Sequence, residues 1–308
     1  MSMRNLAGNY RVARGAVLAA VFLSFILTAS GCRTRSESAK KTPPPTSARN
    51  PAIGGAKVAA QPPGQDDGQW LMPAKNYAST RYSQLDQINT QNVKSLKVAW
   101  TFSTGNTRGH EAAPLIVGST MYVVAPFPNY LYALDLANSG ASKWVYKPPV
   151  DAAAQGVACC DHVNRGASYD DGKVFYNTLD GQTVAVDAET GKEVWRTPLG
   201  DINKGESITM APLVVKGKVL VGNSGGEFGV RGWLTALDTE SGAIAWRAYS
   251  TGPDRDVLIG PGFHPFYASD RGADLGVTSW PPDRWQIGGG TVWGFVSYDP
   301  DLDLLFYG

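Results

Sequence analysis

The strongest constraint on the fold is a sequence unit that recurs every 51 residues. The segments LYALDLANSGASKW, TVAVDAETGKEVW and LTALDTESGAIAW end at Trp144, Trp195 and Trp246. Each contains a strand pattern, an aspartate turn with Ser-Gly or Thr-Gly, and a second strand that ends in tryptophan. A period of about 50 residues with this content is typical of the four-stranded blades of a β-propeller. We therefore predict an all-β chain in which each tryptophan packs against the next blade, with an open tandem array as the alternative.

The turns of this unit have a physical explanation. The aspartate side chain can accept hydrogen bonds from its own turn, while Gly191 or Gly242 supplies the residue with a positive φ angle. Two further apolar segments, SLKVAW ending at Trp100 and TVWGFVSYDPDLDLLFYG ending at Gly308, are also expected to form strands. Together these segments give about four blade equivalents, within the range of known propellers.

The composition suits such a fold. Of the 308 residues, 43% are hydrophobic and 18% are charged, which is sufficient for a large core in one or two domains. Abundant glycine (35), proline (20) and tryptophan (9) favour short strands joined by tight turns. The net charge is +1, and no basic patch interleaved with aromatic residues occurs, so we expect no nucleic-acid partner.

Residues 1–31 are predicted to be a targeting signal. Three arginines precede an apolar run over residues 16–29, which is too short to span a membrane comfortably. The run ends in LTASGC, which resembles a bacterial lipoprotein signal with Cys32 as the lipid-carrying residue, although Ala29 stands where leucine is usual. An ordinary secretory signal and an uncleaved anchor are the alternatives. In each case we expect export to the periplasm.

Residues 32–69 are predicted to be a flexible tether, and residues 70–308 the folded domain. The tether is rich in proline, serine and alanine and has almost no large apolar residues, so it cannot bury enough surface to fold. It would connect a lipid anchor to the folded domain.

A cysteine doublet, Cys159 and Cys160, lies in the segment GVACCDHVNR. Disulfides favour Cα separations of about 4.4–6.8 Å, whereas adjacent residues are about 3.8 Å apart, so a bond between these two cysteines would close a strained ring. Two interpretations are open, namely a vicinal disulfide that presents a rigid flat apolar surface and a pair of buried thiols. Export favours the disulfide, because the compartment would be oxidising.

The segments around these features resemble the pyrroloquinoline quinone (PQQ)-dependent alcohol dehydrogenases of the methanol and ethanol type. The resemblance covers about residues 70–308. It rests on WLMPAKNYASTRYSQLDQINTQNVKSLKVAW, RGHEAAPL, the cysteine doublet, LGDINKGESITMAPLVV, GNSGGEFGVRGWLTALD, WRAYSTGPDRDVLIGP and IGGGTVWG. The family fold is an eight-bladed propeller, so the resemblance implies that about the first half is present here.

The resemblance also implies which residues contact PQQ, a flat molecule with three carboxylates and quinone oxygens. A Cys159–Cys160 disulfide would cover one face of the quinone, and Trp293 would stack on the other, although Trp293 alone reads as one more blade tryptophan. The polar contacts implied are a bidentate arginine, two hydroxyls, a backbone amide and a glutamate, which are Arg165, Thr209, Ser224, Gly225 and Glu111. Taken singly, each also reads as an ordinary structural residue.

Glu227, in the glycine-rich SGGEFG, matches the first protein ligand of the metal ion in this family. Carboxylate oxygens suit calcium or a lanthanide, and such an ion would polarise the quinone carbonyl. A solvated turn carboxylate is the alternative. The later carboxylates in YDPDLDLL lack the glycine of a calcium loop and are expected to lie in a blade turn.

The implied activity is oxidation of a primary alcohol to the aldehyde, with electrons passed to a periplasmic cytochrome c. The family's asparagine ligand and catalytic base correspond to positions beyond Gly308, so no base is assigned and residues 1–308 alone are expected to be inactive. A chain that ends at Gly308 would be a half propeller, for which a homodimer is an option. The alternatives are a non-enzymatic lipoprotein propeller scaffold of the outer-membrane assembly type and a quinoprotein that oxidises sugars.

Overall fold

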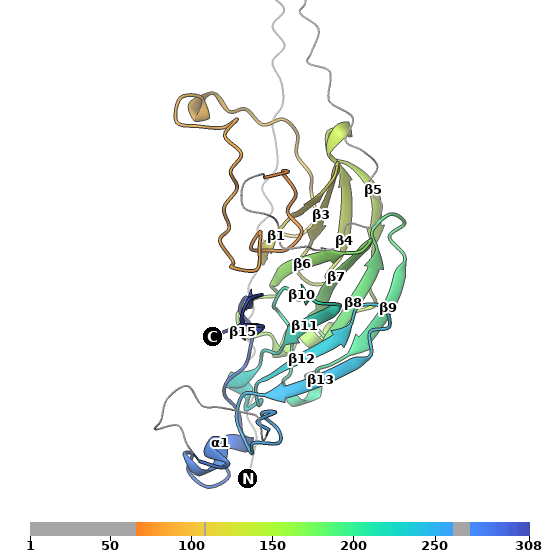
Figure 1. The fold of residues 1–308 in the computed structure, drawn as a ribbon. Helices are drawn as coiled ribbons and strands as arrows, with labels where there is room; N and C mark the ends of the chain where they lie inside the picture. Colours follow the sequence, from red (N-terminus) through yellow and green to blue (C-terminus); the bar gives the residue numbers. More distant parts are fainter. Residues whose placement is uncertain (1–65, 108, 261–271) are drawn as a thin grey trace, which may run out of the picture. The chain divides into compact units, whose positions relative to one another are not determined.

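Sheets of four antiparallel strands, each in simple up-and-down order, repeat along the chain (Figure 1). The computed structural model describes residues 66–107, 109–260 and 272–308, all within one structural unit, Asn50–Gly308. The predicted signal, Cys32 and most of the predicted tether lie outside these residues. No helix in the described ranges is long and apolar enough to cross a membrane.

Each four-stranded sheet is one blade. The first blade contains β2 (Leu115–Val117), β3 (Thr120–Val124), β4 (Leu131–Asp135) and β5 (Ala141–Tyr146). The second contains β6 (Asn164–Asp170), β7 (Lys173–Thr178), β8 (Gln182–Asp187) and β9 (Glu193–Pro198). The third contains β10 (Leu213–Val215), β11 (Lys218–Gly222), β12 (Trp233–Asp238) and β13 (Ile244–Tyr249). The predicted all-β fold of four-stranded propeller blades is thus confirmed.

The remaining elements are short. A hairpin of β14 (Ser297–Asp299) and β15 (Leu304–Phe306) follows the third blade. The helical segments are α1 (Leu275–Thr278) and the 3-10 turns η1 (Val93–Ser95), η2 (Leu136–Asn138), η3 (Ala152–Val157), η4 (Ile202–Lys204), η5 (Gly226–Phe228) and η6 (Arg284–Gln286).

Two expectations about strands need correction. The segment 95–100 was expected to be a strand, but it pairs with no strand of the described chain, and Leu96 and Val98 are exposed. An alternating pattern becomes a strand only where a partner strand is available. The described residues therefore form three blades and one hairpin rather than about four blade equivalents.

Each of the first two blade tryptophans contacts the turn of the following blade, as predicted. The indole nitrogen of Trp144, on β5, donates a hydrogen bond to the Ala188 carbonyl at 3.2 Å. That of Trp195, on β9, donates to the Thr239 carbonyl at 3.0 Å. The aromatic ring thus fixes one blade against its neighbour.

The glycines of these turns make room for the rings. Gly191 and Gly242 have φ angles of +71° and +68°, which confirms the predicted left-handed conformation. A Cβ atom at either position would lie 2.6 Å from the indole packed on it. Asp187 and Asp238 accept hydrogen bonds from their own turns, as expected.

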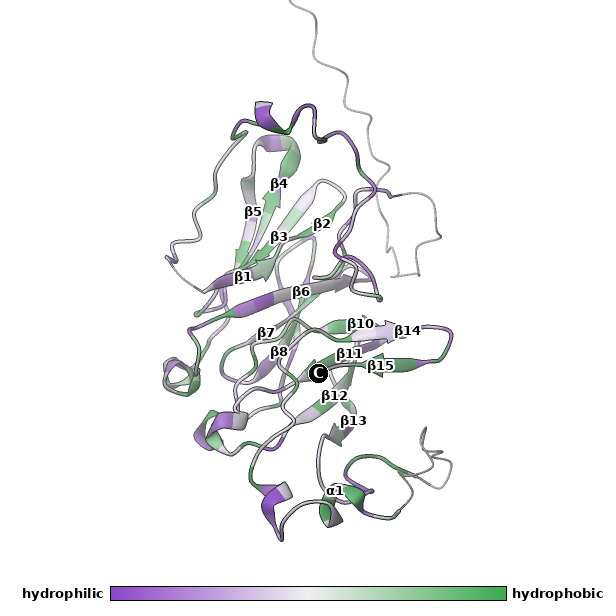
Figure 2. Ribbon diagram, turned by 90° about the vertical axis from the view of Figure 1, so that its left-hand side faces the viewer, coloured by the Kyte–Doolittle hydropathy of each residue, from purple (hydrophilic) through white to green (hydrophobic). Residues whose placement is uncertain are grey.

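The hydrophobic core lies between adjacent blades. The largest cluster joins Phe175 of the second blade to Trp233 of the third, and both are fully buried. Figure 2 shows hydrophobic colour on strands such as β4, β10 and β15, whereas several of the connecting loops are hydrophilic. The blades therefore depend on one another for burial of their faces.

One strand departs from the repeat. β1 (His110–Ala113) precedes the first blade in sequence but pairs in parallel with β6, the first strand of the second blade, with His110 opposite Asn164. This pairing gives the second sheet a fifth strand and brings Glu111 next to Arg165 on β6.

An ion pair organises the start of the described chain. The Asp66 carboxylate lies 2.9 Å from the Lys75 ammonium, and both side chains are less than 10% exposed, at 7% and 5%. The same carboxylate accepts hydrogen bonds from the Ser83 hydroxyl and the Gln84 amide. Asp66 falls within residues 32–69, which were predicted to be a tether, so ordered contacts begin slightly before Trp70.

Candidate functional site

Arg165 is the centre of a polar cluster at the start of β6. One guanidinium nitrogen donates to the Thr209 hydroxyl at 2.8 Å, and another lies 3.2 Å from the Glu111 carboxylate. The Arg165 side chain is 17% exposed, so this charge is partly withdrawn from water. Its backbone amide also donates to the Thr209 carbonyl at 3.1 Å, which fixes both residues relative to each other.

The cluster continues from Thr209 to Ser224. Their hydroxyl oxygens are 2.8 Å apart, and Thr209 is buried. The Ser224 amide donates to the Ser207 carbonyl at 2.8 Å, so the segment after β11 is held against the segment before β10. The result is a continuous line of donors from a cation to two hydroxyls.

Trp293 lies beside this line. Its ring centre is 5.1 Å from the Arg165 guanidinium carbon, and 52% of the residue is exposed. A flat aromatic surface is therefore available next to the donors. The preceding residue, Val292, packs closely on Gly222. A Cβ atom on Gly222 would collide with the Val292 carbonyl.

The structure joins Cys159 and Cys160 in a disulfide with a Cα–Cα separation of 3.8 Å. Both residues are exposed, in the loop between η3 and β6. This loop leads directly into Arg165, so the disulfide is placed at the same end of the second blade as the polar cluster.

Glu227 is exposed and lies on η5, three residues after Ser224. Gly225, between them, has a φ angle of +107°, and a Cβ atom there would collide with the Gly205 carbonyl. The loop can follow this path only with glycine at this position. No group of three or more His, Cys, Asp or Glu residues that could hold a metal occurs in the described chain.

Six of the predicted site residues thus lie together in the structure, either in direct contact or next to a contacting residue in the chain. Glu111, Arg165, Thr209 and Ser224 are in contact, Trp293 lies against Arg165, and Gly225 follows Ser224.

Sequence reasoning missed the glycines that set the path of the Trp293 segment. Gly232 meets Gly290 so closely that a Cβ atom on Gly232 would overlap the Gly290 carbonyl. The signal was present in the glycine-rich GVRGW and IGGG segments, because repeated glycines often mark close approach of two backbones.

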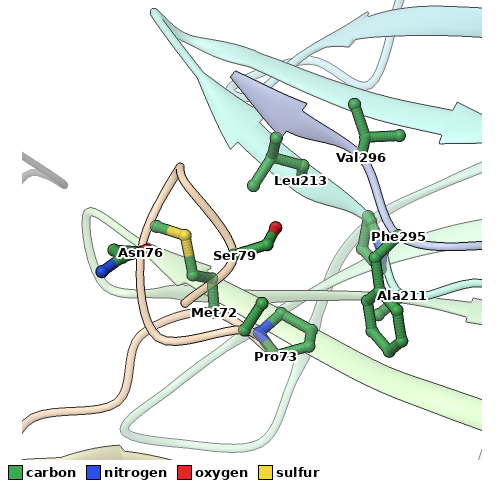
Figure 3. Close-up of a pocket in the computed structure, with 10 residues that line it drawn as sticks. Met72, Pro73, Asn76, Ser79, Ala211, Leu213, Phe295 and Val296 are labelled. Carbon is green, nitrogen blue, oxygen red and sulfur yellow. The ribbon is translucent and has the colours of Figure 1, made fainter. Parts of the chain in front are cut away.

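A small pocket lies nearby but does not have the chemistry of this cluster. Figure 3 shows side chains from three segments facing it. Its lining is Met72, Pro73, Ala74, Asn76, Ser79, Ala211, Pro212, Leu213, Phe295 and Val296. None of these is charged, so the pocket does not suit a carboxylate-bearing ligand, and the Arg165 cluster is the better candidate site.

Comparison with known families decides the family. The model described as "PQQ: Glucose/ethanol/alcohol dehydrogenase, beta-propeller domain" matches residues 70–308. The chain belongs to this quinoprotein family. The resemblance seen in the sequence is thereby confirmed.

Similar quinoproteins extend well beyond the matched region. A lanthanide-dependent methanol dehydrogenase of Methylacidiphilum fumariolicum (strain SolV) is 56% identical over 245 residues, which cover 79% of this chain and 40% of that protein. Methanol dehydrogenase (cytochrome c) subunit 1 of Methylobacterium organophilum is 49% identical over 250 residues, with the same two coverages of 79% and 40%. This chain therefore spans 40% of the length of these relatives.

Solved quinoprotein structures agree with this fold. A europium-containing methanol dehydrogenase superposes with a TM-score of 0.76 and 56% sequence identity, covering 78% of this chain and 42% of that one. The quinohemoprotein alcohol dehydrogenase ADH-IIG from Pseudomonas putida gives a TM-score of 0.69 at 40% identity, covering 79% and 34%.

The donor set of the cluster fits PQQ, the cofactor named by the family. Arginine offers five N–H donors in a plane, and the contacts of Arg165 with Thr209 and Glu111 use only some of them. The remaining donors can hold a carboxylate, while hydroxyls suit quinone or carboxylate oxygens. A half-exposed indole suits a flat aromatic ligand.

Proposed function

We propose that this chain forms part of a PQQ-dependent dehydrogenase that oxidises a primary alcohol of the methanol or ethanol type to the aldehyde. The observation that carries the proposal is the line of contacts from Glu111 through Arg165 and Thr209 to Ser224, next to the half-exposed ring of Trp293. Together these residues supply positive charge, hydroxyl donors and a flat aromatic surface. These features suit PQQ, a planar molecule with three carboxylates.

Each residue has a defined role in this proposal. Arg165 binds a carboxylate of PQQ with two parallel N–H donors, and Glu111 holds the guanidinium in orientation. Thr209 and Ser224 donate their hydroxyls, and the Gly225 backbone amide adds a donor close to the ligand. PQQ, when bound, supplies the two-electron acceptor for the alcohol.

Two further groups are proposed to cover the two flat faces of the cofactor. Trp293 provides the stacking surface for one side of the cofactor, and the Cys159–Cys160 disulfide covers the other side and excludes water. Glu227 is proposed as a ligand of calcium or a lanthanide, since these ions prefer carboxylate oxygens. The name of the lanthanide-dependent relative supports a metal at this site.

The partners and location follow from the same proposal. A cytochrome c would accept the electrons, which is consistent with the name of the Methylobacterium relative, methanol dehydrogenase (cytochrome c) subunit 1. We propose a periplasmic protein attached to a bacterial membrane by lipid on Cys32, with residues 33–69 as the connection. A non-enzymatic scaffold would have no need for the arginine, hydroxyl and disulfide set.

A titration tests the proposed function. The purified chain is titrated with PQQ in the presence of calcium or lanthanum, and quenching of tryptophan fluorescence is recorded. We expect saturable quenching that is at least tenfold weaker in Arg165→Gln. Arg196→Gln is the matched control, because the Arg196 side chain is 16% exposed and also pairs with a glutamate, Glu193, in the second blade. Non-saturable quenching in the parent protein would favour the scaffold instead.

A further inference from the structure

Arg231 lies just before β12 of the third blade and contacts two aromatic rings. Its guanidinium carbon is 3.9 Å from the ring centre of Tyr249 and 4.7 Å from that of Trp285. In the plane of the group, Nε donates to the Thr251 carbonyl at 2.9 Å and Nη2 donates to the Asp256 carboxylate at 3.0 Å. A planar guanidinium can stack on aromatic rings and donate hydrogen bonds from its edge at once, which an ammonium group cannot.

These contacts hold together segments that are distant in sequence. Tyr249 ends β13, whereas Trp285 belongs to η6. The Thr251 hydroxyl also donates to the Trp285 carbonyl at 3.1 Å. The Arg231 side chain is 16% exposed, so its charge depends on these partners rather than on water.

The backbone of Arg231 is tied to the segment that carries Trp293. Arg231 forms a parallel bridge with Gly289, and the Gly232 amide donates to the Gly289 carbonyl at 2.9 Å. Gly232 and Gly290 approach so closely that a Cβ atom on Gly232 would overlap the Gly290 carbonyl. Three residues separate Gly289 from Trp293.

The same backbone is tied to the loop that carries Glu227. The Arg231 carbonyl accepts a hydrogen bond at 3.1 Å from the side-chain amide of Asn223, a buried residue that immediately precedes Ser224. In addition, a Cβ atom on Gly288 would lie 3.2 Å from the Gly226 carbonyl, which places the two glycine-rich loops in contact.

We propose that Arg231 is a positioning residue: by clamping Tyr249, Thr251, Asp256 and Trp285, it fixes the Glu227 loop and the Trp293 segment relative to each other. Arg231 itself does not touch the ligand. The inference rests on the proposed function for its consequence, because the two segments that Arg231 aligns are the proposed metal-binding loop and the proposed stacking surface.

Hydrogen exchange of the full chain without PQQ tests the clamp directly. In Arg231→Lys, the charge is kept but the stacking of the guanidinium on Tyr249 and Trp285 is lost, so we expect amides of residues 225–230 and 288–293 to exchange about tenfold faster. Arg247→Lys is the matched control, because Arg247 also stacks on an indole, that of Trp233 at 4.0 Å, and also lies in the third blade. Its exchange at the two segments should match that of the parent protein.

A second variant keeps the test decisive if Arg231→Lys does not fold. Trp285→Leu removes one ring of the stack and leaves the arginine, so it should accelerate exchange at the same two segments. Unchanged exchange there in the folded variants, or equal acceleration throughout the chain, would overturn the inference.

PQQ titration then links the clamp to the proposed function. We expect PQQ binding to be about fivefold weaker in Arg231→Lys and unchanged in Arg247→Lys. The comparison requires that both variants melt at a temperature similar to that of the parent protein. If the parent protein binds no PQQ, the proposed function fails, while the exchange result still decides whether Arg231 aligns the two segments. Equal PQQ affinity in parent and Arg231→Lys would contradict the positioning role.

Discussion

The indole nitrogen of Trp195 donates a hydrogen bond to the carbonyl oxygen of Thr239 at 3.0 Å, across the boundary between the second and third blades. Trp195 lies on the last strand of its blade, and Thr239 begins the turn of the next one. The ring rests on Gly242 in that turn. This polar contact and this glycine therefore fix one point at which the two neighbouring sheets pack.

Gly242→Ala is expected to destabilise the fold by about 3 kcal/mol, because it combines a positive φ angle with a collision between Cβ and the Trp195 ring. Gly172→Ala is the control, since Gly172 has a φ angle of +76° but no atom within 4 Å of its Cβ position. For the control we expect the free energy of unfolding to fall by only about 1 kcal/mol. Urea unfolding measures both values, and equal losses would show that the contact with Trp195 is unimportant.

Asp66→Asn is expected to lower the free energy of unfolding by about 2 kcal/mol at neutral pH, because Lys75 is left without its carboxylate. The hydrogen bond from the Ser83 hydroxyl, and then that from Lys75, holds the pKa of Asp66 well below its usual range. A lowered pKa stabilises the fold above the unfolded pKa of about 4, and this contribution is lost as the pH falls below that value.

Unfolding of the parent protein and Asp66→Asn should therefore be compared at pH 7 and at acid pH. The difference between them should shrink below about pH 4. A difference that is constant with pH would argue against a role for the charge of Asp66.

Arg165→Lys should weaken PQQ binding by at least tenfold, although the positive charge is kept. Lysine cannot donate two parallel hydrogen bonds to one carboxylate and cannot reach Thr209 and Glu111 in the same geometry. Ser224→Ala, which removes one neutral hydroxyl at the far end of the line, should weaken binding less, by about fivefold. Fluorescence titration separates the two effects, and the reverse ranking would place the main anchor elsewhere.

Cys159 and Cys160 should resist alkylation in the folded protein until a reductant is added. Peptide mapping before and after reduction gives the answer, since the unreduced peptide that contains both residues should carry no alkyl group. Detection of two alkylated cysteines without reductant would show that the native pair is a dithiol.

Cys159→Ser should also weaken PQQ binding, if the disulfide covers a face of the cofactor.

The repeat made the blades predictable. Strand alternation, the aspartate turn and tryptophan recur locally, so each blade carries its own signal, and the positions of Gly191 and Gly242 followed from the turn chemistry. The segment ending at Trp100 was mispredicted for a physical reason. A strand is a pairing between two segments, and local alternation does not reveal whether a partner is present.

The site was predictable only in part. Arg165, Thr209 and Ser224 were identified by resemblance, but their hydrogen bonds require β6 to meet the segment before β10 and the segment after β11. The stack around Arg231 left no signal, because Tyr249 and Trp285 are distant in sequence and follow no period. Long-range contacts of this kind are set by packing rather than by local pattern.

The parallel pairing of β1 with β6 has a consequence for the order of folding. β1 and β6 are separated in sequence by the whole first blade. Closing so long a loop is entropically unfavourable until that blade has formed and drawn the two ends together. We therefore expect the Glu111–Arg165 ion pair to form after the first blade during refolding, at the step in which the second sheet acquires its fifth strand.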